Sequence, residues 1–384
     1  MDHKKIFIIA GEPSADIHAA ALVMELKKSQ PNLKIIGIGS KKMQEAGVEI
    51  FADLSQYAVI GFIEVLKHYP IFKKIFNLTL DKIRQENPRA IVLIDYPGFN
   101  LRLAKKIRQK FPQVKIIYYI SPQVWAWGQK RIELIKKIVD KMIVVFDFEK
   151  TLYLKHGVNA EFVGHPLLEI INPQADKTEI MKKHNLVSEY EYLGILPGSR
   201  IMEVKRILPV MLKAAKKLSF NNPHLIFLLF KAANIPDDLV EKLLSNYQHL
   251  NLKIIKKNRH EILSICSFAW VCSGTATLET AILNTPMLIV YKTSFLTWAI
   301  SKCLIKLPYI GLVNIVVGEK IVPEFVQYQA TAENICNFTQ NWFRQDQKDK
   351  QILKQKLSTV KQKLGSLNAN KNTAQIITNL IITE

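Results

Sequence analysis

Short apolar runs alternate with helical patterns along the chain, and this alternation is the strongest constraint on its fold. Each run is about as long as a buried strand, and most are followed by a stretch with helical periodicity. Strands that are separated by helices pair in parallel, so the pattern predicts an α/β fold with helices on both faces of parallel sheets. The runs occupy residues 5–10, 34–39, 90–95, 115–120 and 141–146, and then 192–196, 225–230, 252–257, 268–272 and 287–291.

The alternation occurs twice, with a polar interruption near residues 168–190 that we interpret as a linker. A chain of 384 residues also exceeds what one hydrophobic core usually serves. We therefore predict two Rossmann-like domains, residues 1–168 and 169–345. Residues 346–384 are polar with helical periodicity, and we expect them to form C-terminal helices that pack back toward the N-terminal domain.

The formal net charge of +20 predicts an anionic partner. Such a partner could be nucleic acid, an anionic membrane surface or a phosphorylated substrate. We expect no nucleic acid partner, because the sequence has no RRM signature, KH loop or zinc-finger spacing. The four cysteines lack metal-ligand spacing, which argues against a structural zinc site or a disulfide framework.

The first strand-like run is too short for the apolar region of a secretory signal, and no segment has the roughly 20 apolar residues of a membrane-spanning helix. We therefore expect a cytoplasmic protein.

Two turns in the second half have the composition of an anion site. Gly198, Ser199 and Arg200 follow one strand and precede a helix, and the segment Ser273, Gly274 and Thr275 repeats this arrangement. Amides at a helix N-terminus favour an anion, and an arginine adds a charged contact. Each turn alone is compatible with a purely structural role. Together with Glu279, whose carboxylate would accept from ribose hydroxyls, they predict a site for a nucleoside diphosphate.

Two carboxylates follow strands of the first half, where open α/β sheets bind their ligands. Glu12 lies in a tight loop after the first strand, and Asp95 directly follows the strand at 90–94. Asp95 either caps a turn or acts as a base whose pKa is raised by partial burial. Ser14 or Asp16 would cap the helix that we expect to begin near Asp16.

Three further side chains of the first half have two interpretations each. Trp125 and Trp127 either stack on a ligand or fill the core, and we favour the core. His165 follows a short strand and precedes a proline, a position where a backbone contact is more common than catalysis.

Residues 59–80 combine apolar side chains with lysines, a pattern that fits a membrane interface and fits an ordinary core helix equally well. The candidate membrane-facing or acceptor-facing residues are Ile60, Phe62, Ile63, Leu66, Phe72, Phe76, Lys73 and Lys74.

The whole chain resembles the lipid A disaccharide synthases, glycosyltransferases of the GT-B architecture. The resemblance rests on seven short motifs in the same order: "AGEPSADIHAA", "IDYPGFN", "YYISPQVWAWGQKRI", "GHPL", "LPGSR", "SGTATLE" and "VPEFVQ". It implies two Rossmann-like domains facing a cleft, the first for the acceptor and the second for the UDP-sugar.

The resemblance also implies a reaction. The enzyme would transfer 2,3-diacylglucosamine from its UDP derivative, with inversion, to the 6-hydroxyl of 2,3-diacylglucosamine 1-phosphate, giving the β-1′,6-linked disaccharide phosphate and UDP. Glu12 and Asp95 would be the acidic residues of the acceptor side, with Asp95 the better candidate for the base. Arg200 would meet the diphosphate, Glu279 the ribose, and Asn314 the sugar or phosphate. No cofactor or metal is expected.

A lipid substrate favours the membrane interpretation of residues 59–80, on the anionic cytoplasmic face of the inner membrane. The opening motif departs from the family in one respect. Ala15 and Ala19 stand where the family usually has glycine, and their methyl groups limit close approach by an acceptor. The alternatives are a GT-B enzyme or epimerase that acts on a UDP-sugar with a soluble substrate, and a non-enzymatic peripheral membrane protein.

Overall fold

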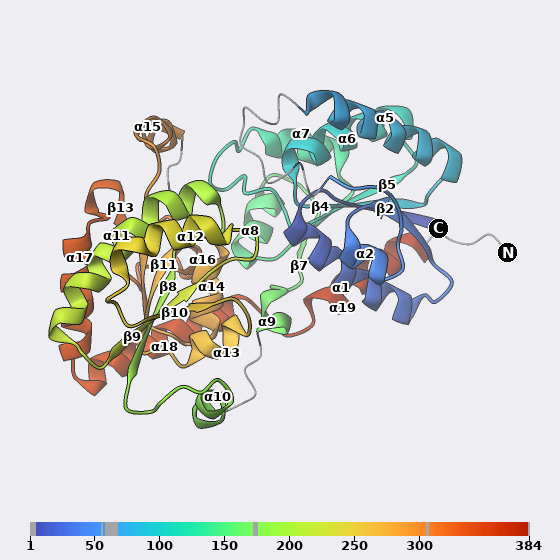
Figure 1. The fold of residues 1–384 in the computed structure, drawn as a ribbon. Helices are drawn as coiled ribbons and strands as arrows, with labels where there is room; N and C mark the ends of the chain where they lie inside the picture. The colour runs from blue at the N-terminus through green and yellow to red at the C-terminus, as the bar shows by residue number, and fades with distance from the viewer. Residues whose placement is uncertain (1–4, 55–56, 58–67, 172–175, 305–306, 383–384) are drawn as a thin grey trace. The chain divides into compact units, whose positions relative to one another are not determined.

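A computed structural model describes residues 5–54, 57, 68–171, 176–304 and 307–382 (Figure 1). The chain divides into two compact units. Unit 1 comprises residues 1–169 and 365–384, and unit 2 comprises residues 170–364. Each unit is built on one parallel sheet, so the predicted α/β class is confirmed.

Unit 1 holds a seven-stranded sheet in the order β3-β2-β1-β4-β5-β6-β7. In its parallel register, Ile6 lies opposite Ile35 on one side and Ala90 on the other. Because β1, β4 and β5 are covered on both faces, their side chains are almost all buried and their sequences are continuous apolar runs. The strands are β1 (Lys5–Ala10), β2 (Lys34–Ile38), β3 (Glu49–Ala52), β4 (Ala90–Ile94), β5 (Lys115–Tyr119), β6 (Lys141–Val144) and β7 (Ala160–Phe162).

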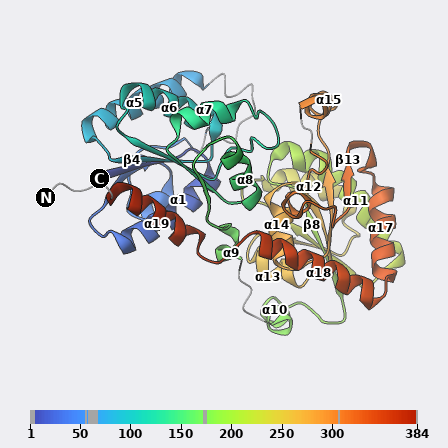
Figure 2. The same cartoon turned by 180° about the vertical axis from the view of Figure 1, so that it is seen from behind.

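Helices cover both faces of this sheet (Figures 1 and 2). One face carries the main core, to which α5 (Tyr69–Glu86), α6 (Pro97–Lys110) and α7 (Arg131–Ile138) contribute. The remaining helices of the unit are α1 (Pro13–Ser29), α2 (Lys41–Glu45), α8 (Asp147–Lys155), α9 (Leu167–Ile170), which reaches the unit boundary, and α19 (Ala369–Ile382).

Unit 2 repeats the same plan with six strands in the order β10-β9-β8-β11-β12-β13. These are β8 (Glu191–Leu196), β9 (Leu225–Phe230), β10 (Leu252–Ile255), β11 (Phe268–Cys272), β12 (Met287–Tyr291) and β13 (Glu324–Val326). The helices are α10 (Lys177–Lys183), α11 (Ile201–Asn221), α12 (Asp237–Leu244), α13 (Arg259–Ser264), α14 (Thr275–Ile282), α15 (Phe295–Leu304), α16 (Leu312–Val317), α17 (Ala332–Arg344) and α18 (Gln347–Lys363). Its main core lies between the sheet and α11, α12 and α17.

The edge strands β3 and β13 were not predicted, for a physical reason. They are four and three residues long and only partly buried, so they lack the apolar run that marks the inner strands. β10, at the other edge of its sheet, ends at Ile255, short of the predicted residue 257.

The C-terminal segment, which we grouped as residues 346–384, is divided between the two units. The first of its helices, α18, belongs to unit 2 and packs on α14 and α16. The last helix, α19, belongs to unit 1 and lies against α1 (Figure 2). Asn370 of α19 donates to both carboxylate oxygens of Glu169, through its backbone N–H at 3.1 Å and its side-chain amide at 2.6 Å.

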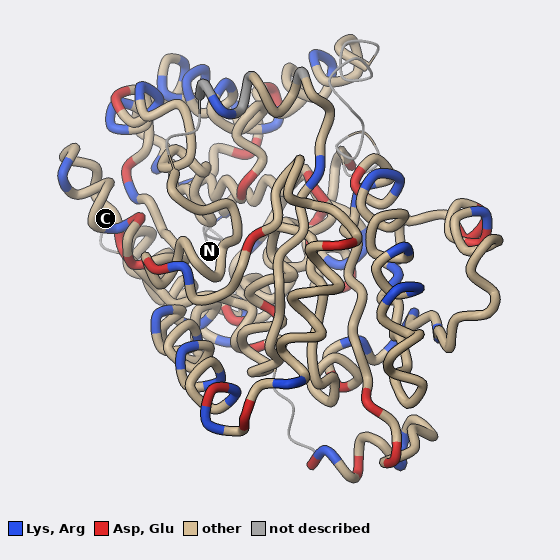
Figure 3. The backbone as a smooth tube through the Cα atoms, turned by 90° about the vertical axis from the view of Figure 1, so that its left-hand side faces the viewer, with Lys and Arg blue, Asp and Glu red and all other residues tan. Residues whose placement is uncertain are grey.

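Lysines and arginines are spread over both units rather than gathered on one element (Figure 3). Among the described residues, no helix combines the length and the apolar character that crossing a bilayer requires.

Asp16 lies inside α1, which begins at Pro13, so our expectation that it caps this helix is wrong. Its carboxylate instead accepts from the backbone N–H groups of Ser40, Lys42 and Met43, at 2.7, 3.0 and 3.4 Å, and thereby caps α2. The side chain is only 4% exposed. A buried carboxylate with three amide donors connects the first helix to the loop that follows β2.

A second buried carboxylate, Glu149 of α8, was not singled out from the sequence. The Ser121 hydroxyl and the Trp125 indole N–H donate to its Oε1 at 2.8 and 2.9 Å. Burial raises the pKa of Glu149 to about 7, although these hydrogen bonds favour the charged form. Glu149 therefore fixes the loop after β5 to α8.

We expect Asp16→Ala to destabilise unit 1 by about 2 kcal/mol, because three backbone amides lose their carboxylate acceptor. Urea denaturation measures the change. Glu45→Gln is the matched control on α2, since it removes only surface ion pairs with Lys41 and Lys42 and costs less than about 0.5 kcal/mol. Equal effects of the two substitutions would contradict the capping role.

Glu149→Gln tests the raised pKa. Between about pH 4.5 and pH 7 the carboxyl ionises in the unfolded chain but keeps its proton in the folded one, so wild-type stability falls as the pH rises. The neutral glutamine lacks this dependence. We expect the stability of wild type relative to Glu149→Gln to fall by on the order of 3 kcal/mol across this window. Melting temperatures measured along the pH series, with exposed Glu133→Gln as the surface-charge control, check this; a flat difference would refute it.

Candidate functional site

In both units the strand order reverses beside the first strand, between β1 and β4 in unit 1 and between β8 and β11 in unit 2. Loops that leave the carboxyl ends of such neighbouring strands diverge to opposite faces and leave room for a ligand. The predicted residues follow these four strands. Glu12 follows β1, Asp95 follows β4, and the turns at 198–200 and 273–275 follow β8 and β11.

One pocket of unit 2, about 210 Å³ in volume, collects the two turns. Leu196, Glu203, Phe230, Ala232, Arg259, Cys272 and Ala276 line it together with the predicted Gly198, Ser199, Arg200, Ser273, Gly274, Thr275 and Glu279. We call this the β8–β11 pocket. The fold thus brings together seven residues that are up to 81 positions apart in the sequence.

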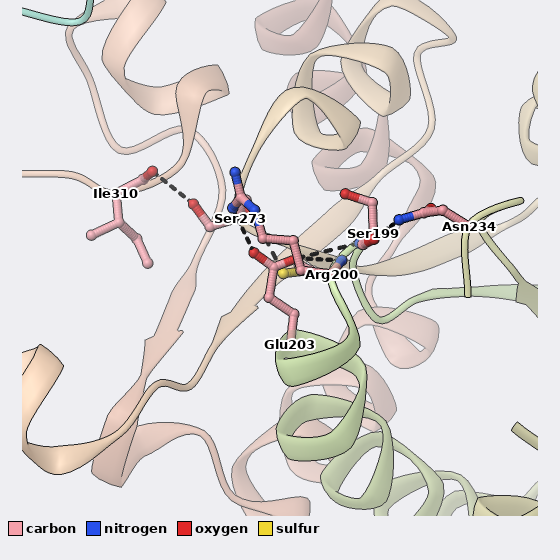
Figure 4. Close-up of polar contacts among 7 residues, drawn as sticks. Ser199, Arg200, Glu203, Asn234, Ser273 and Ile310 are labelled. Carbon is pink, nitrogen blue, oxygen red and sulfur yellow. Dashed lines mark hydrogen bonds and ion pairs between the residues drawn. The ribbon is translucent and has the colours of Figure 1, made fainter. Parts of the chain in front are cut away.

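The first turn already holds a carboxylate (Figure 4). The backbone N–H groups of Ser199 and Arg200 donate to Oε2 of Glu203, at 3.3 and 3.2 Å, and the Arg200 guanidinium donates to Oε1 at 2.9 Å. Gly198 has φ of +112°, and a Cβ there would lie 2.6 Å from Oε2, so glycine is required. Glu203 was not predicted from the sequence, although its position three residues after the helix N-cap is that of a capping box.

The second turn is open. Gly274, with φ of +141°, is the N-cap of α14 and has no side chain with which to cap this helix. A Cβ on Gly274 would meet nothing within 4 Å. The Ser273 hydroxyl donates to the carbonyl of Ile310 at 2.8 Å, which fixes the turn from behind (Figure 4). The first-turn amides of α14 therefore form the more accessible anion-binding position of the pocket.

Glu279 lies one turn into α14, and its Oε2 is 3.3 Å from the Arg259 guanidinium and 3.6 Å from Nε2 of His260. Burial raises the pKa of Glu279, but the His260 contact and the Arg259 charge outweigh it and hold the pKa below its ordinary value. The carboxylate is therefore ionised and acts as an acceptor. The sequence analysis missed Arg259 and His260, because they follow a different strand, β10.

Asn314 is not part of the pocket lining, contrary to our expectation. Its side chain is fully buried, and its amide donates to the Val322 carbonyl and to Glu324. Its carbonyl oxygen accepts from the N–H groups of Ile321 and Val322. All of the contacts it makes are internal, so Asn314 holds the loop after α16 rather than a ligand.

In unit 1, Asp95 and the next residue, Tyr96, both adopt left-handed backbone conformations, with φ of +49° and +46°. Such conformations are costly for residues other than glycine and gather at functional sites. The Asp95 carbonyl accepts from Asn100 at 2.8 Å and from the Tyr118 hydroxyl at 2.6 Å, which pins the strained turn. Burial raises the pKa of the Asp95 carboxyl, and a backbone hydrogen bond from Tyr96 lowers it in part.

Glu12 is the N-cap of α1, and it and Asp95 are close enough to Tyr118 that both charges raise the pKa of that hydroxyl, after the larger effect of burial. Gly11 lets the Tyr96 ring pack closely against the loop after β1, because a Cβ at Gly11 would lie 2.4 Å from that ring. The fold therefore brings the two predicted carboxylates to one end of the sheet. Ala15 and Ala19 are buried in α1.

An apolar groove of about 530 Å³ lies between α5 and α6 and is rimmed by basic side chains. Its lining comprises Tyr69, Phe72, Lys73, Phe76, Asn77, Tyr96, Gly98, Phe99 and Arg102. Three predicted residues, Phe72, Lys73 and Phe76, are among them. Lys74 is exposed on the same helix, while Ile60, Phe62, Ile63 and Leu66 lie outside the described residues. Because Tyr96 lines this α5–α6 groove, the groove adjoins Asp95.

The remaining sequence candidates have distinct environments. Trp125 is hydrogen-bonded to Glu149. Trp127 is 46% exposed, with the Arg131 guanidinium 4.2 Å from its ring centre, so the core position that we favoured is wrong for Trp127. His165 is buried, its Nδ1 accepts from the Leu167 N–H at 3.1 Å, and burial lowers its pKa to about 3. His165 is therefore neutral and held by a backbone contact, which is the role that we favoured.

Comparisons with known proteins identify the family of the chain. The family model for lipid-A-disaccharide synthetase matches residues 6–378. Lipid-A-disaccharide synthase 1 of Legionella pneumophila is 42% identical over 366 residues, covering 95% of this chain and 94% of that protein. The lipid-A-disaccharide synthase of Coxiella burnetii is 38% identical over 383 residues and is covered in full, as is this chain.

Solved structures share the fold at low sequence identity. The S. aureus MnaA–UDP co-structure has a TM-score of 0.69 and 15% identity, over 99% of this chain and 98% of that one. The UDP-GlcNAc 2-epimerase of Neisseria meningitidis bound to UDP-GlcNAc has a TM-score of 0.66 and 12% identity, over 99% and 100%. The fold is therefore that of the GT-B glycosyltransferases and epimerases. The chain is a UDP-sugar-dependent glycosyltransferase with a role in lipid A biosynthesis, and it belongs to the lipid-A-disaccharide synthase family.

Proposed function

We propose that the protein transfers 2,3-diacylglucosamine from UDP-2,3-diacylglucosamine to the 6-hydroxyl of 2,3-diacylglucosamine 1-phosphate, with inversion. The products are the β-1′,6-linked disaccharide 1-phosphate and UDP. The observation that carries the proposal is the β8–β11 pocket, in which an open helix N-terminus, an arginine and an ionised carboxylate line one space.

On the donor side, the amides of Gly274 and Thr275 and the Arg200 guanidinium would hold the diphosphate. As the bond from the sugar C1 to the diphosphate breaks, charge builds up on the leaving oxygen, and preorganised donors stabilise it without reorganisation. Glu279, held ionised, accepts hydrogen bonds from the ribose hydroxyls. The two turns and Glu279 line the same pocket, which supports this assignment of diphosphate and ribose contacts.

On the acceptor side, Asp95 is the proposed base. It takes the proton of the 6-hydroxyl while that oxygen attacks C1 of the donor from the face opposite the diphosphate, which gives inversion. The raised pKa of its carboxyl makes it a better proton acceptor than an exposed aspartate, and the pinned backbone turn fixes its direction. Glu12, near the same end of the sheet, would orient the acceptor.

The α5–α6 groove supports a lipid acceptor. Its floor is aromatic, its rim carries Lys73 and Arg102, and Tyr96 links it to the base. We propose that it takes an acyl chain while the basic side chains meet the 1-phosphate. We further propose that α5, whose Tyr69 and Leu78 are exposed, faces the anionic cytoplasmic surface of the inner membrane.

Asp95→Asn tests the base. We expect transfer to fall by at least about 100-fold, because general base catalysis is lost while the shape of the side chain is kept. Mass analysis of the disaccharide phosphate formed from the two substrates gives the rate, and calorimetry gives the affinity for UDP, which stays within twofold. Glu12→Gln is the comparison. More than a tenth of wild-type turnover in Asp95→Asn would remove Asp95 from this role, and a larger loss in Glu12→Gln would assign the base to Glu12.

Lys73→Gln with Lys74→Gln tests the membrane-facing helix. Each lysine near an anionic surface contributes about 1 kcal/mol, so the double variant should bind anionic phospholipid vesicles about 10- to 30-fold more weakly in co-sedimentation. The matched control removes two exposed lysines from α11 of unit 2, Lys213→Gln with Lys216→Gln. An equal loss in both double variants would show that net charge alone, and not α5, determines binding; no binding by wild type would favour a soluble substrate.

A further inference from the structure

We propose that Arg259 and His260 are positioning residues that fix the Glu279 carboxylate so that the donor pocket selects a ribonucleotide over a deoxyribonucleotide. This inference rests on the proposed function, because it assumes that Glu279 meets the ribose of the donor. It adds a source of sugar specificity in residues that neither the motifs nor the family resemblance singled out.

Arg259 and His260 begin α13, after β10, and reach the same oxygen of Glu279, Oε2, at 3.3 and 3.6 Å. Arg259 also lines the β8–β11 pocket, as does Glu279. Because both contacts are made to Oε2, the carboxylate is held from one side.

The three residues are incompletely hydrogen-bonded. Among the described residues, Arg259 Nε, His260 Nε2 and Glu279 Oε2 are buried side-chain atoms without a hydrogen-bond partner. Two of these atoms, His260 Nε2 and Glu279 Oε2, lie 3.6 Å apart, slightly beyond hydrogen-bond distance, so the cluster is loosely paired and a polar ligand can complete it. A vicinal diol supplies two hydroxyl groups that both donate and accept, and it fits a cluster with an acceptor and two nitrogen groups.

The electrostatics agree with this assignment. Burial in the pocket raises the pKa of Glu279, and His260 and Arg259 lower it enough to leave the group ionised. An ionised carboxylate only accepts, so it is matched to two hydroxyl donors, and a charged acceptor forms a stronger hydrogen bond than a neutral one. Without Arg259, desolvation would favour the protonated form, which accepts less well.

Arg200 serves a different part of the ligand. It pairs with Glu203 on α11, next to the anion-binding turns, whereas Arg259 pairs with Glu279. Substitutions of these two arginines are therefore expected to change nucleotide binding in different ways. Arg200 acts on the diphosphate, which UDP and its 2′-deoxy analogue share, and Arg259 acts through Glu279 on the ribose, in which they differ.

The experiment measures the affinities of the full-length protein for UDP and 2′-deoxy-UDP by calorimetry. We expect wild type to prefer UDP at least tenfold, as the loss of one hydrogen bond to a charged acceptor implies. Arg259→Ala with His260→Ala should reduce the preference to threefold or less, as should Glu279→Gln. Arg259→Lys keeps the positive charge and should therefore retain part of the wild-type preference for UDP. Arg200→Ala should weaken both ligands while the ratio stays at the wild-type value, and Arg344→Ala, an exposed arginine of α17, should change neither.

An unchanged UDP to 2′-deoxy-UDP ratio in the Arg259 and His260 variant would overturn the inference, whether its melting temperature falls or not. So would an equal loss of both ligands, since that result would assign Arg259 to the diphosphate. The proposed function fails separately, if wild type does not bind UDP at all. Equal binding of the two nucleotides by wild type would overturn the inference alone.

Discussion

A parallel strand that is buried on both faces uses its backbone polar groups within the sheet and offers only apolar side chains to the layers above and below. Polar chemistry is therefore confined to the ends of such strands. In this protein β1 and β4 of one sheet, and β8 and β11 of the other, are buried almost throughout. Each of these strands ends in a loop that carries proposed site residues, and the reversal of strand order separates the loops of each pair.

Charge pairing within the β8–β11 pocket shapes what it can bind. The two arginines that line it are each paired with a carboxylate, Arg200 with Glu203 and Arg259 with Glu279. The formal charges of these four side chains cancel, so the pocket does not attract a diphosphate through excess positive charge alone. The directional donors of the α14 N-terminus then matter more, since amide groups bind an anion without a counter-carboxylate. Glu203 stabilises the first turn at the cost of two amides that a phosphate would otherwise use.

The loop after β4 in unit 1, which carries the proposed base, depends on backbone strain instead. Two consecutive left-handed residues, Asp95 and Tyr96, persist because Asn100 and Tyr118 hold the Asp95 carbonyl and because Gly11 makes room for the Tyr96 ring. The same turn places Tyr96 in the lining of the α5–α6 groove. A single strained turn thus links a carboxyl of raised pKa to an apolar surface, which is the combination that a lipid with a reactive hydroxyl requires.

The sequence by itself determined the two parallel sheets, the inner strands and the turns after β8 and β11, because continuous apolar runs and glycine at positive φ are local requirements that can be read residue by residue. It also identified Asp95 and Glu12 as carboxylates at strand ends. Only the tertiary structure decided which side chains meet. It turned Asn314 inward against Glu324, directed Asp16 to α2, gave the amides of Ser199 and Arg200 to Glu203, and brought Arg259 and His260 from the loop after β10 to Glu279. These outcomes depend on contacts between segments, or on the choice between a ligand and a neighbouring side chain for the same polar group, and no local pattern encodes either.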